Sequence, residues 1–351
     1  MTDAVSALAG LGWSAFFQSQ LDLTEIDTSL PVRVLAVHRN ALEVDGGDGP
    51  ERLVMTGNAL DLEVTVGDWL IAGRDTRRPL RVLERRSVFQ RRAAGTGRAV
   101  QLIAANVDTL FIVSSCNRDF NVPRLERYLA LAKEAGVTPV VVLTKADQCE
   151  APQDFRRRAE TILPGLLAET VDARDPSALS GLALWCGPGQ TVALVGSSGV
   201  GKSTLVNTLA DETDLRTAAA RAGDDRGRHT TTGRMLHRLS AGGWLLDTPG
   251  MRELQLFDVD SGIEAVFEDI LTLAARCRFK DCQHDTEPGC AVQAAIEAGT
   301  LEPERLSRYR KLASEERRNS QSLAERRTQQ RSFGKMCKTV MRTKRAHRGE
   351  F

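Results

Sequence analysis

The sequence lacks any uninterrupted apolar run of about 18 residues, the length that a helix needs to span a bilayer. Its start, MTDAVSALAGLGWSAFF, has no basic region and no clear cleavage site, which argues against a secretory signal. Apolar residues make up 42% and charged residues 26% of the chain, a composition that excludes a wholly disordered protein. We therefore predict a soluble, cytoplasmic protein, and 351 residues are enough for two or three domains.

The sequence also lacks the even number of cysteines that a disulfide framework requires. It has seven, and three of them lie close to a histidine, which indicates metal chemistry in a reducing compartment. The net charge of +1 hides segregated charge. Residues 326–349 contain nine Lys or Arg and no Asp or Glu, and Arg85, Arg86, Arg91 and Arg92 form a second cluster. Both clusters suit contact with a polyanion, although the tail could equally be a solubilising end.

The pattern of strands and helices predicts a multi-domain protein. Residues 30–97 contain short strand-like runs separated by Gly, Asp, Asn and Pro, which predict a β-barrel of the oligonucleotide-binding (OB-fold) type, with an SH3-like barrel as the alternative. Residues 98–262 alternate buried strands and amphipathic helices, which predicts a central α/β domain with a mostly parallel sheet. Residues 263–325 are predicted to be helical around the Cys/His cluster. Residues 1–29 form an N-terminal segment without an assignment, and 326–351 form the basic tail.

A phosphate-binding loop is the strongest motif in the central domain. GSSGVGKST matches G-x-x-x-x-G-K-[ST], in which glycines let backbone N–H groups surround the β-phosphate, Lys202 reaches the β- and γ-phosphates, and Ser203 binds Mg²⁺. A chance Gly-rich turn is the alternative, but a strand precedes the motif and a helix follows it. The predicted contacts are Gly196, Ser197, Ser198, Gly199, Val200, Gly201, Lys202, Ser203 and Thr204.

A second motif, DTPG, lies some forty residues further on and follows the apolar run Trp244 to Leu246. Asp247, at the end of a buried strand, is suited to hold Mg²⁺ through a water molecule, and the Gly250 N–H is suited to sense the γ-phosphate. Alone this pattern would be an ordinary turn. Its distance from the phosphate loop favours the nucleotide interpretation.

The motif TKAD follows the strand VVVL and comprises Thr144, Lys145, Ala146 and Asp147. The Asp147 carboxylate can accept two hydrogen bonds from the N1–H and N2–H₂ edge of guanine, while the Lys145 stem lies over the base. Adenine has no matching pair of donors, so this motif favours GTP over ATP. A solvated loop is the alternative. Thr144 stands where Asn is usual and keeps only a hydroxyl to brace the neighbouring loops.

The order of the motifs is unusual, because the base-reading motif precedes the phosphate loop by about fifty residues. In common Ras-like GTPases the phosphate loop comes first. The same sheet can form if the chain is cut elsewhere and the old ends are joined, so the order predicts a circular permutation. Asp172 and Ala173 lie where the second base loop belongs, with Asp172 in place of the usual Ser.

Together these segments resemble the circularly permuted, ribosome small-subunit-dependent GTPases known as RsgA or YjeQ. The resemblance implies an OB-fold barrel, a permuted P-loop GTPase domain and a zinc-binding helical domain. It also implies a role in late maturation of the small ribosomal subunit, which stimulates GTP hydrolysis. The matching segments are LERRSVFQRRAAG, AANVDTLFIV, DFNVPRLERYL, VVLTKADQ, GSSGVGKSTLVN, GRHTTTGR, DTPGMREL and the cysteine cluster.

The cysteine cluster has the pattern C-x₄-C-x-H-x₅-C, formed by Cys277, Cys282, His284 and Cys290. Three thiolates and one imidazole suit a closed, tetrahedral structural Zn²⁺ site, and the family's zinc ligands fall on these positions. Buried free cysteines are the alternative.

The segment GRHTTT lies where the first switch belongs, and Thr230 or Thr231 would cover Mg²⁺ and the γ-phosphate there. Many GTPases orient the attacking water with a Gln just after D-x-x-G, whereas this chain has Met251. His229 is therefore our candidate for positioning the water. The alternative is a histidine that packs or touches rRNA.

Three functions remain open from the sequence. The first is a GTPase switch that binds the small ribosomal subunit and its rRNA, needs no membrane, and acts as a monomer. The second is an RNA-binding assembly factor in which GTP hydrolysis is secondary. The third is an ATPase, or a GTPase that serves another partner.

Overall fold

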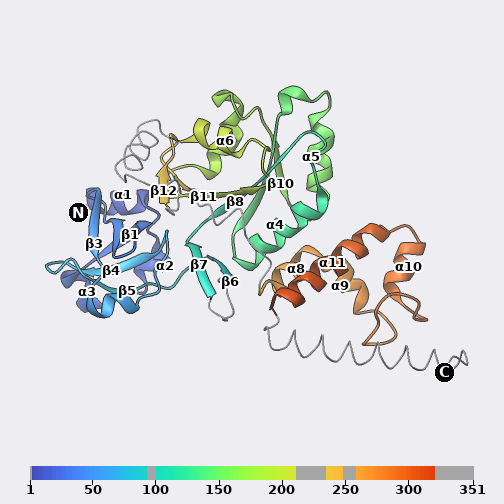
Figure 1. Cartoon of the computed structure of the whole chain (residues 1–351), viewed down its shortest axis with the longest axis horizontal. Helices are drawn as coiled ribbons and strands as arrows, with labels where there is room; N and C mark the ends of the chain where they lie inside the picture. The colour runs from blue at the N-terminus through green and yellow to red at the C-terminus, as the bar shows by residue number, and fades with distance from the viewer. Residues whose placement is uncertain (1, 93–99, 211–234, 248–257, 321–351) are drawn as a thin grey trace, which may run out of the picture.

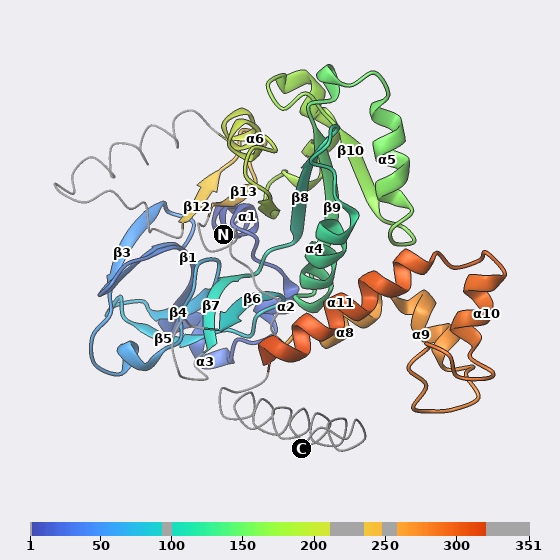
Figure 2. The same cartoon turned by 45° about the vertical axis from the view of Figure 1, so that its right-hand side comes forward.

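The computed structural model of the whole chain describes residues 2–92, 100–210, 235–247 and 258–320 (Figure 1). A β-rich part formed by the N-terminal third, a central sheet flanked by helices, and a group of C-terminal helices follow one another along the chain. Figure 2 shows the central sheet between the other two parts. Within the described ranges, no helix is both long enough and apolar enough to cross a membrane.

The β-rich part is built on five antiparallel strands in the order β3-β2-β1-β4-β5. Its core is lined by alternating apolar residues such as Val32, Val34, Leu42 and Leu70, as a strand with one buried face requires. The short strands predicted within residues 30–97 are confirmed. The OB-fold assignment remains a prediction. The strands are β1 (Ser29–Val37), β2 (Ala41–Asp45), β3 (Pro50–Val54), β4 (Trp69–Gly73) and β5 (Pro79–Val82).

Helices precede this part, and a hairpin follows it. The N-terminal segment forms α1 (Thr2–Gly10), α2 (Ala15–Gln18) and α3 (Leu23–Thr28). The hairpin pairs β6 (Val88–Arg92) with β7 (Val100–Ala105). The proposed domain boundary at 97/98 therefore falls between two paired strands, and the division of the chain into domains remains a proposal.

The central sheet contains five parallel strands in the order β10-β9-β8-β11-β13, which confirms the predicted, mostly parallel sheet. In the sheet, the antiparallel strand β12 lies next to β13. On its other side it pairs with β1 at Met235 and Ala36, so that the two sheets are continuous. The strands are β8 (Thr109–Ser115), β9 (Thr138–Thr144), β10 (Leu167–Thr170), β11 (Thr191–Gly196), β12 (Met235–Arg238) and β13 (Trp244–Asp247).

Helices cover both faces of the central sheet. Alternate residues of β8 face opposite sides: Ile112 belongs to the core shared with α4 (Val122–Glu134) and α5 (Pro152–Glu160), whereas Phe111 belongs to the core shared with α6 (Lys202–Leu209). A 3₁₀ segment, η3 (Pro176–Trp185), packs on the α6 side. The strands are apolar on both faces, as buried parallel strands must be.

The C-terminal helices dock on α4 through a buried ion-pair cluster. The Glu126 carboxylate is 1% exposed and accepts hydrogen bonds from Arg305 at 2.8 Å and Arg308 at 2.9 Å. Gly262 lets the backbone approach closely, because a Cβ there would lie 2.1 Å from the carbonyl oxygen of Ala130. The helices are α8 (Asp260–Val266), α9 (Glu268–Ala274), α10 (Ala291–Glu297) and α11 (Pro303–Ser320).

A buried arginine joins the β-rich part to the central sheet. Arg33 of β1 is 1% exposed, and its guanidinium donates to the Thr191 hydroxyl at 2.6 Å, at the start of β11, and to the Leu11 carbonyl. Burial lowers the pKa of Arg33 to about 10, against the attraction of Asp108. Burial also raises the pKa of Asp108, while the Thr191 N–H and Arg33 oppose that rise. The attraction between Arg33 and Asp108 therefore offsets part of the cost of burying their charges at the junction.

We predict that Arg33→Met destabilises the protein by about 3 kcal/mol, because buried acceptors at the junction lose their charged donor. Urea unfolding measures the loss. Arg52→Met, on the exposed side of β3, is the matched control and should stay within about 0.5 kcal/mol of the parent. Equal stability of the two variants would contradict the role of Arg33.

Candidate nucleotide-binding site

The phosphate loop connects β11 to α6 at the carboxyl edge of the parallel strands. Gly196 has φ 148°, and a Cβ there would lie 2.2 Å from the carbonyl oxygen of Val113, so the turn requires glycine. Gly199 and Gly201 also have positive φ, at 79° and 91°. The strand-loop-helix arrangement that the motif predicts is confirmed. A loop of this shape presents N–H groups and a helix N-terminus to an anion.

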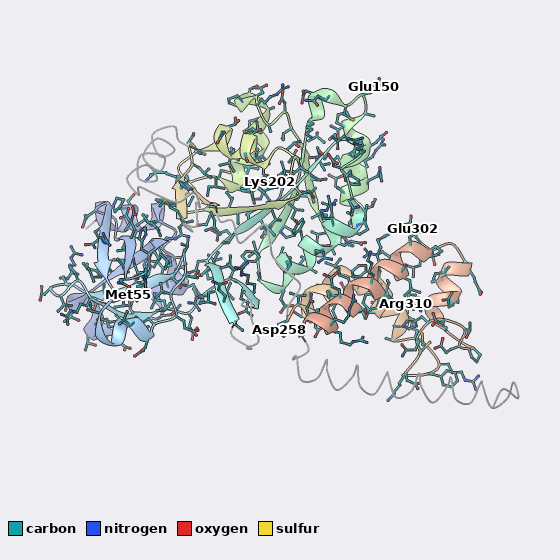
Figure 3. All side chains as sticks on the ribbon, viewed as in Figure 1. Met55, Glu150, Lys202, Asp258, Glu302 and Arg310 are labelled. Atoms are coloured by element: carbon teal, nitrogen blue, oxygen red, sulfur yellow. The ribbon has the colours of Figure 1, made fainter. Side chains whose placement is uncertain are left out.

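The polar side chains of the loop are partly or fully exposed to solvent. The Lys202 ammonium donates to the Gly196 carbonyl at 2.7 Å and to the Ser197 carbonyl, so its side chain folds back over the loop. Ser203 and Thr204, in the first turn of α6, are exposed, as Ser198 and Gly199 of the loop are. Figure 3 shows Lys202 in the central domain, apart from Arg310 of the C-terminal helices.

Thr144 connects the base-reading motif to the phosphate loop. Its side chain is fully buried, and its hydroxyl lies 2.5 Å from the Val200 carbonyl oxygen and 3.1 Å from that of Ser114. One proton serves these two acceptors, and the bond to Val200 is the shorter. The hydroxyl therefore braces neighbouring loops, as expected for a Thr in place of Asn at this position.

The base-reading motif lies at the same edge, after β9. Lys145 has a left-handed backbone with φ 59°, and the Ala146 N–H donates to the Val171 carbonyl at 3.3 Å. Because β10 is the parallel neighbour of β9, Asp172 and Ala173 follow at the same edge. Ala173 is buried, and its carbonyl accepts from the Thr208 hydroxyl of α6 at 2.7 Å. The two predicted base loops and the phosphate loop are thus brought together.

Arg174 is a further residue at this edge and lies outside the predicted motifs. Its guanidinium lies 2.7 Å from an Asp147 carboxylate oxygen and 3.1 Å from both carboxylate oxygens of Asp172. The hydrogen bond from Arg174 is the main cause that lowers the pKa of Asp172. The only sequence signal was a basic residue directly after the second base loop.

Several predicted residues lie outside the described ranges: His229, Thr230, Thr231, Gly250 and Met251. Asp247 is described by its backbone alone. It ends β13 directly after Leu246, which pairs with Ala193 of β11, so its backbone reaches the edge that carries the phosphate loop.

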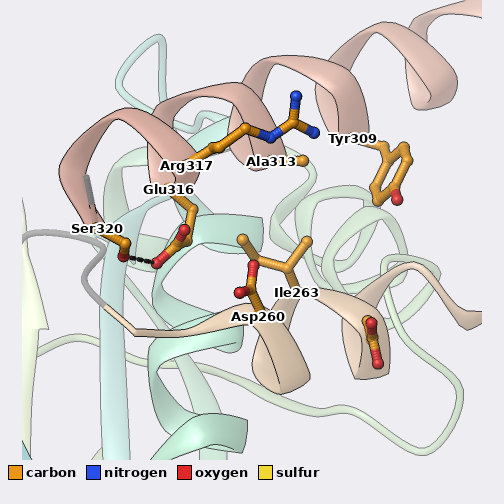
Figure 4. Close-up of a pocket in the computed structure, with 8 residues that line it drawn as sticks. Asp260, Ile263, Tyr309, Ala313, Glu316, Arg317 and Ser320 are labelled. Atoms are coloured by element: carbon orange, nitrogen blue, oxygen red, sulfur yellow. Dashed lines mark hydrogen bonds between the residues drawn. The ribbon is translucent and has the colours of Figure 1, made fainter. Parts of the chain in front are cut away.

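A cavity of about 520 Å³ elsewhere in the molecule is a poor site for a nucleotide (Figure 4). It lies between α8 and α11, and its charged lining consists of Asp260, Glu264 and Glu316 with Arg317. Burial, and then repulsion from neighbouring carboxylates, raises the pKa of Asp260. A triphosphate would be repelled there, whereas the phosphate loop suits it.

The four predicted metal ligands converge in the C-terminal helices. The ligand atoms of Cys277, Cys282, His284 and Cys290 all lie within 4.8 Å of one another. Cys277 follows α9, and Cys290 is the N-cap residue of α10. Burial by itself raises the pKa of the Cys277 thiol. Backbone N–H groups at the start of α10 outweigh this effect and hold that pKa below its ordinary value. This cluster is compatible with a zinc site.

A phosphate loop between β11 and α6, with base loops after β9 and β10 that precede it in the chain, defines a circularly permuted P-loop GTPase. Comparison with known proteins agrees. Residues 82–257 match the family model described as RsgA GTPase. The chain belongs to the RsgA GTPase family, and it is a GTP hydrolase; this family implies GTP with Mg²⁺.

Curated relatives cover nearly the whole chain. The small ribosomal subunit biogenesis GTPase RsgA of Mesorhizobium japonicum is 51% identical over 91% of this chain and 93% of its own length. The protein named small ribosomal subunit biogenesis GTPase RsgA 2 of Vibrio parahaemolyticus is 50% identical over 96% of this chain and 94% of its own length.

Solved structures share the fold. YjeQ from Thermotoga maritima matches with a TM-score of 0.59 and 24% identity, covering 81% of this chain and 97% of its own. YloQ, described as a circularly permuted GTPase, matches with a TM-score of 0.60 and 23% identity, covering 84% of this chain and 96% of its own.

We predict that Thr144→Val weakens GTP binding about fivefold, because the Val200 carbonyl loses its donor and the phosphate loop becomes less ordered, at a cost of about 1 kcal/mol. Titration calorimetry measures the change. Thr138→Val, at the exposed start of β9, is the matched control and should leave affinity unchanged. Parent-like affinity in Thr144→Val would contradict the bracing role.

Proposed function

We propose that this protein binds immature small ribosomal subunits, assists their late maturation, and leaves them when it hydrolyses GTP. The observation that carries the proposal is identity of 50–51% to proteins named for small ribosomal subunit biogenesis, over more than nine tenths of this chain. The nucleotide supplies the switch, because GTP and its hydrolysis products hold switch segments differently. Binding to rRNA, a monomeric state and a cytoplasmic location belong to this proposal.

The residues of the site have distinct roles in the proposed reaction. The phosphate loop from Gly196 to Thr204 holds the phosphates, and Lys202 turns from the loop carbonyls toward them. The Ser203 hydroxyl and, through water, Asp247 would hold Mg²⁺, which neutralises charge on the β- and γ-phosphates. Asp147 reads the guanine edge. Asp172 and Ala173 line the second base loop.

The remaining assignments rest on the sequence. Thr230 or Thr231 covers the γ-phosphate, Gly250 senses it, and His229 positions the attacking water. Since Met251 cannot orient water, we expect slow turnover until the particle completes the site.

The Cys/His cluster supports a structural Zn²⁺ site in the C-terminal helices. Tetrahedral Zn²⁺ with Zn–S distances of about 2.3 Å and Zn–N distances of about 2.0 Å separates two sulfurs by about 3.8 Å and sulfur from nitrogen by about 3.5 Å. The Sγ atoms of Cys277 and Cys290 are 3.9 Å apart, and they lie 3.6 and 3.5 Å from Nδ1 of His284. The donor set fits. With four protein ligands the ion would stabilise the loop and take no part in hydrolysis.

We predict that the purified protein carries one equivalent of zinc and that Cys277→Ser loses it. Without the ion, the loop that joins α9 to α10 has no crosslink, so α10 should exchange its amide hydrogens faster. Elemental analysis and hydrogen exchange measure the two effects. Cys149→Ser, which changes a cysteine outside the cluster, should keep both zinc and protection. Zinc-free parent protein would refute the site.

We predict that small ribosomal subunits raise the GTPase rate by roughly a hundredfold, the contribution of one positioned catalytic group. Phosphate release is measured with small subunits, with large subunits as the particle control, and with ATP as the competing nucleotide. His229→Ala should bind GTP normally and lose the stimulation.

Three outcomes would count against these assignments. Equal rates with and without small subunits would refute the ribosomal function. Full stimulation of His229→Ala would remove the catalytic role of that histidine. Competition by ATP as strong as that by GTP would contradict the guanine-reading role of Asp147.

A further inference from the structure

Arg174 is hydrogen-bonded to the carboxylate of Asp147, the group that is proposed to bind the guanine edge. Its Nη2 atom donates to Oδ2 of Asp147 at 2.7 Å. The same nitrogen and Nε also donate to the two carboxylate oxygens of Asp172, both at 3.1 Å, and the Arg174 backbone N–H donates to Asp172 at 3.0 Å. Arg174 comes from the loop after β10, and Asp147 comes from the loop after β9.

The donor that Arg174 offers is chemically similar to the guanine edge. A guanidinium group presents N–H donors in a planar fork. Guanine presents N1–H and N2–H₂ on one carbon atom, which is the same N–C–N unit without the charge. Both groups pair with a carboxylate through parallel hydrogen bonds. A guanine that takes both oxygens of Asp147 therefore needs Oδ2, the oxygen that Arg174 contacts.

We propose that Arg174 competes with guanine for Asp147 and so lowers the affinity of the site for guanine nucleotides. This inference rests on the proposed guanine-reading role of Asp147. Nucleotide enters when Arg174 releases Asp147, and the fraction of molecules in the released state scales the apparent affinity.

Asp172 gives Arg174 a second partner after release. Two of the three side-chain hydrogen bonds from Arg174 go to Asp172, so the side chain can leave Asp147 and remain paired. Asp172 stands where the second base loop usually has Ser. A Ser could not hold the guanidinium by charge, so this departure and Arg174 act together.

The size of the effect follows from exposure. The Arg174 side chain is 63% exposed and that of Asp147 is 26% exposed, so water and salt screen the pair. Exposed ion pairs of this kind change an equilibrium by about two- to fivefold. The competition therefore tunes affinity without closing the site.

The test measures GDP and GTP affinity of the full-length protein by titration calorimetry at low and high salt. We expect Arg174→Ala to bind both nucleotides about two- to fivefold more tightly at low salt, with a smaller gain at high salt. Arg174→Lys keeps the positive charge and loses the fork, so it separates competition from long-range attraction of the phosphates and should also bind more tightly. Arg157→Ala removes a charge from α5, where Arg157 pairs with Asp154, and should bind like the parent.

Unchanged or weaker binding by both Arg174 variants at low salt would overturn the inference. Asp147→Asn distinguishes this failure from failure of the base-reading role. An amide there should lower affinity for GDP and raise affinity for xanthosine diphosphate, whose carbonyl accepts from it. In that background Arg174→Ala should no longer tighten GDP binding. If Asp147→Asn leaves the preference for guanine unchanged, the base-reading role itself is wrong.

Discussion

Parallel pairing of β11 with β8 and β13 is the constraint on which the nucleotide site depends. Hydrogen bonds fix Val195 beside Ile112 and Ala193 beside Leu246, and β9 and β10 continue the same direction. Parallel strands end at one edge whatever their order in the chain. The loops after β9, β10 and β11 therefore meet, even though the base motif comes first in the sequence.

Two buried arginine contacts attach the other parts of the chain to that sheet. Arg33 binds the start of β11 from the β-rich part, and Arg305 with Arg308 binds Glu126 of α4 from α11. A buried charge costs free energy unless it is paired. Each contact therefore favours the arrangement of the chain that keeps its charged groups paired. The Glu316 carboxylate also accepts from the Asp258 N–H at 2.8 Å, which fixes the chain entering α8 eleven residues after Asp247.

The contacts of Thr144 and Arg174 are expected to change nucleotide affinity in different ways. Thr144 is buried and acts on the phosphate loop through a short hydrogen bond, so its effect should resist salt. Arg174 is exposed and acts on Asp147 through an ion pair, so its effect should decline with salt. Thr144, in place of the usual Asn, supports the phosphate loop. Asp172, in place of the usual Ser, holds the competing side chain of Arg174.

The phosphate loop, the base motif and the Cys/His pattern could be predicted from the sequence, because each depends on residue types at short, fixed spacing. The permuted order followed from the order of the first two motifs along the chain. The five strands of the β-rich part were also predictable from their alternating apolar residues. The ends of the strands were less predictable: β4 comprises only Trp69–Gly73, although Val66 and Gly67 before it form single backbone hydrogen bonds with Ala105 and Val34. Only the tertiary structure placed Arg174 on Asp147, Arg33 on Thr191 and Arg305 on Glu126. These residues are 27, 158 and 179 positions apart, and a hydrogen bond across such a separation exists only where packing brings the two groups together.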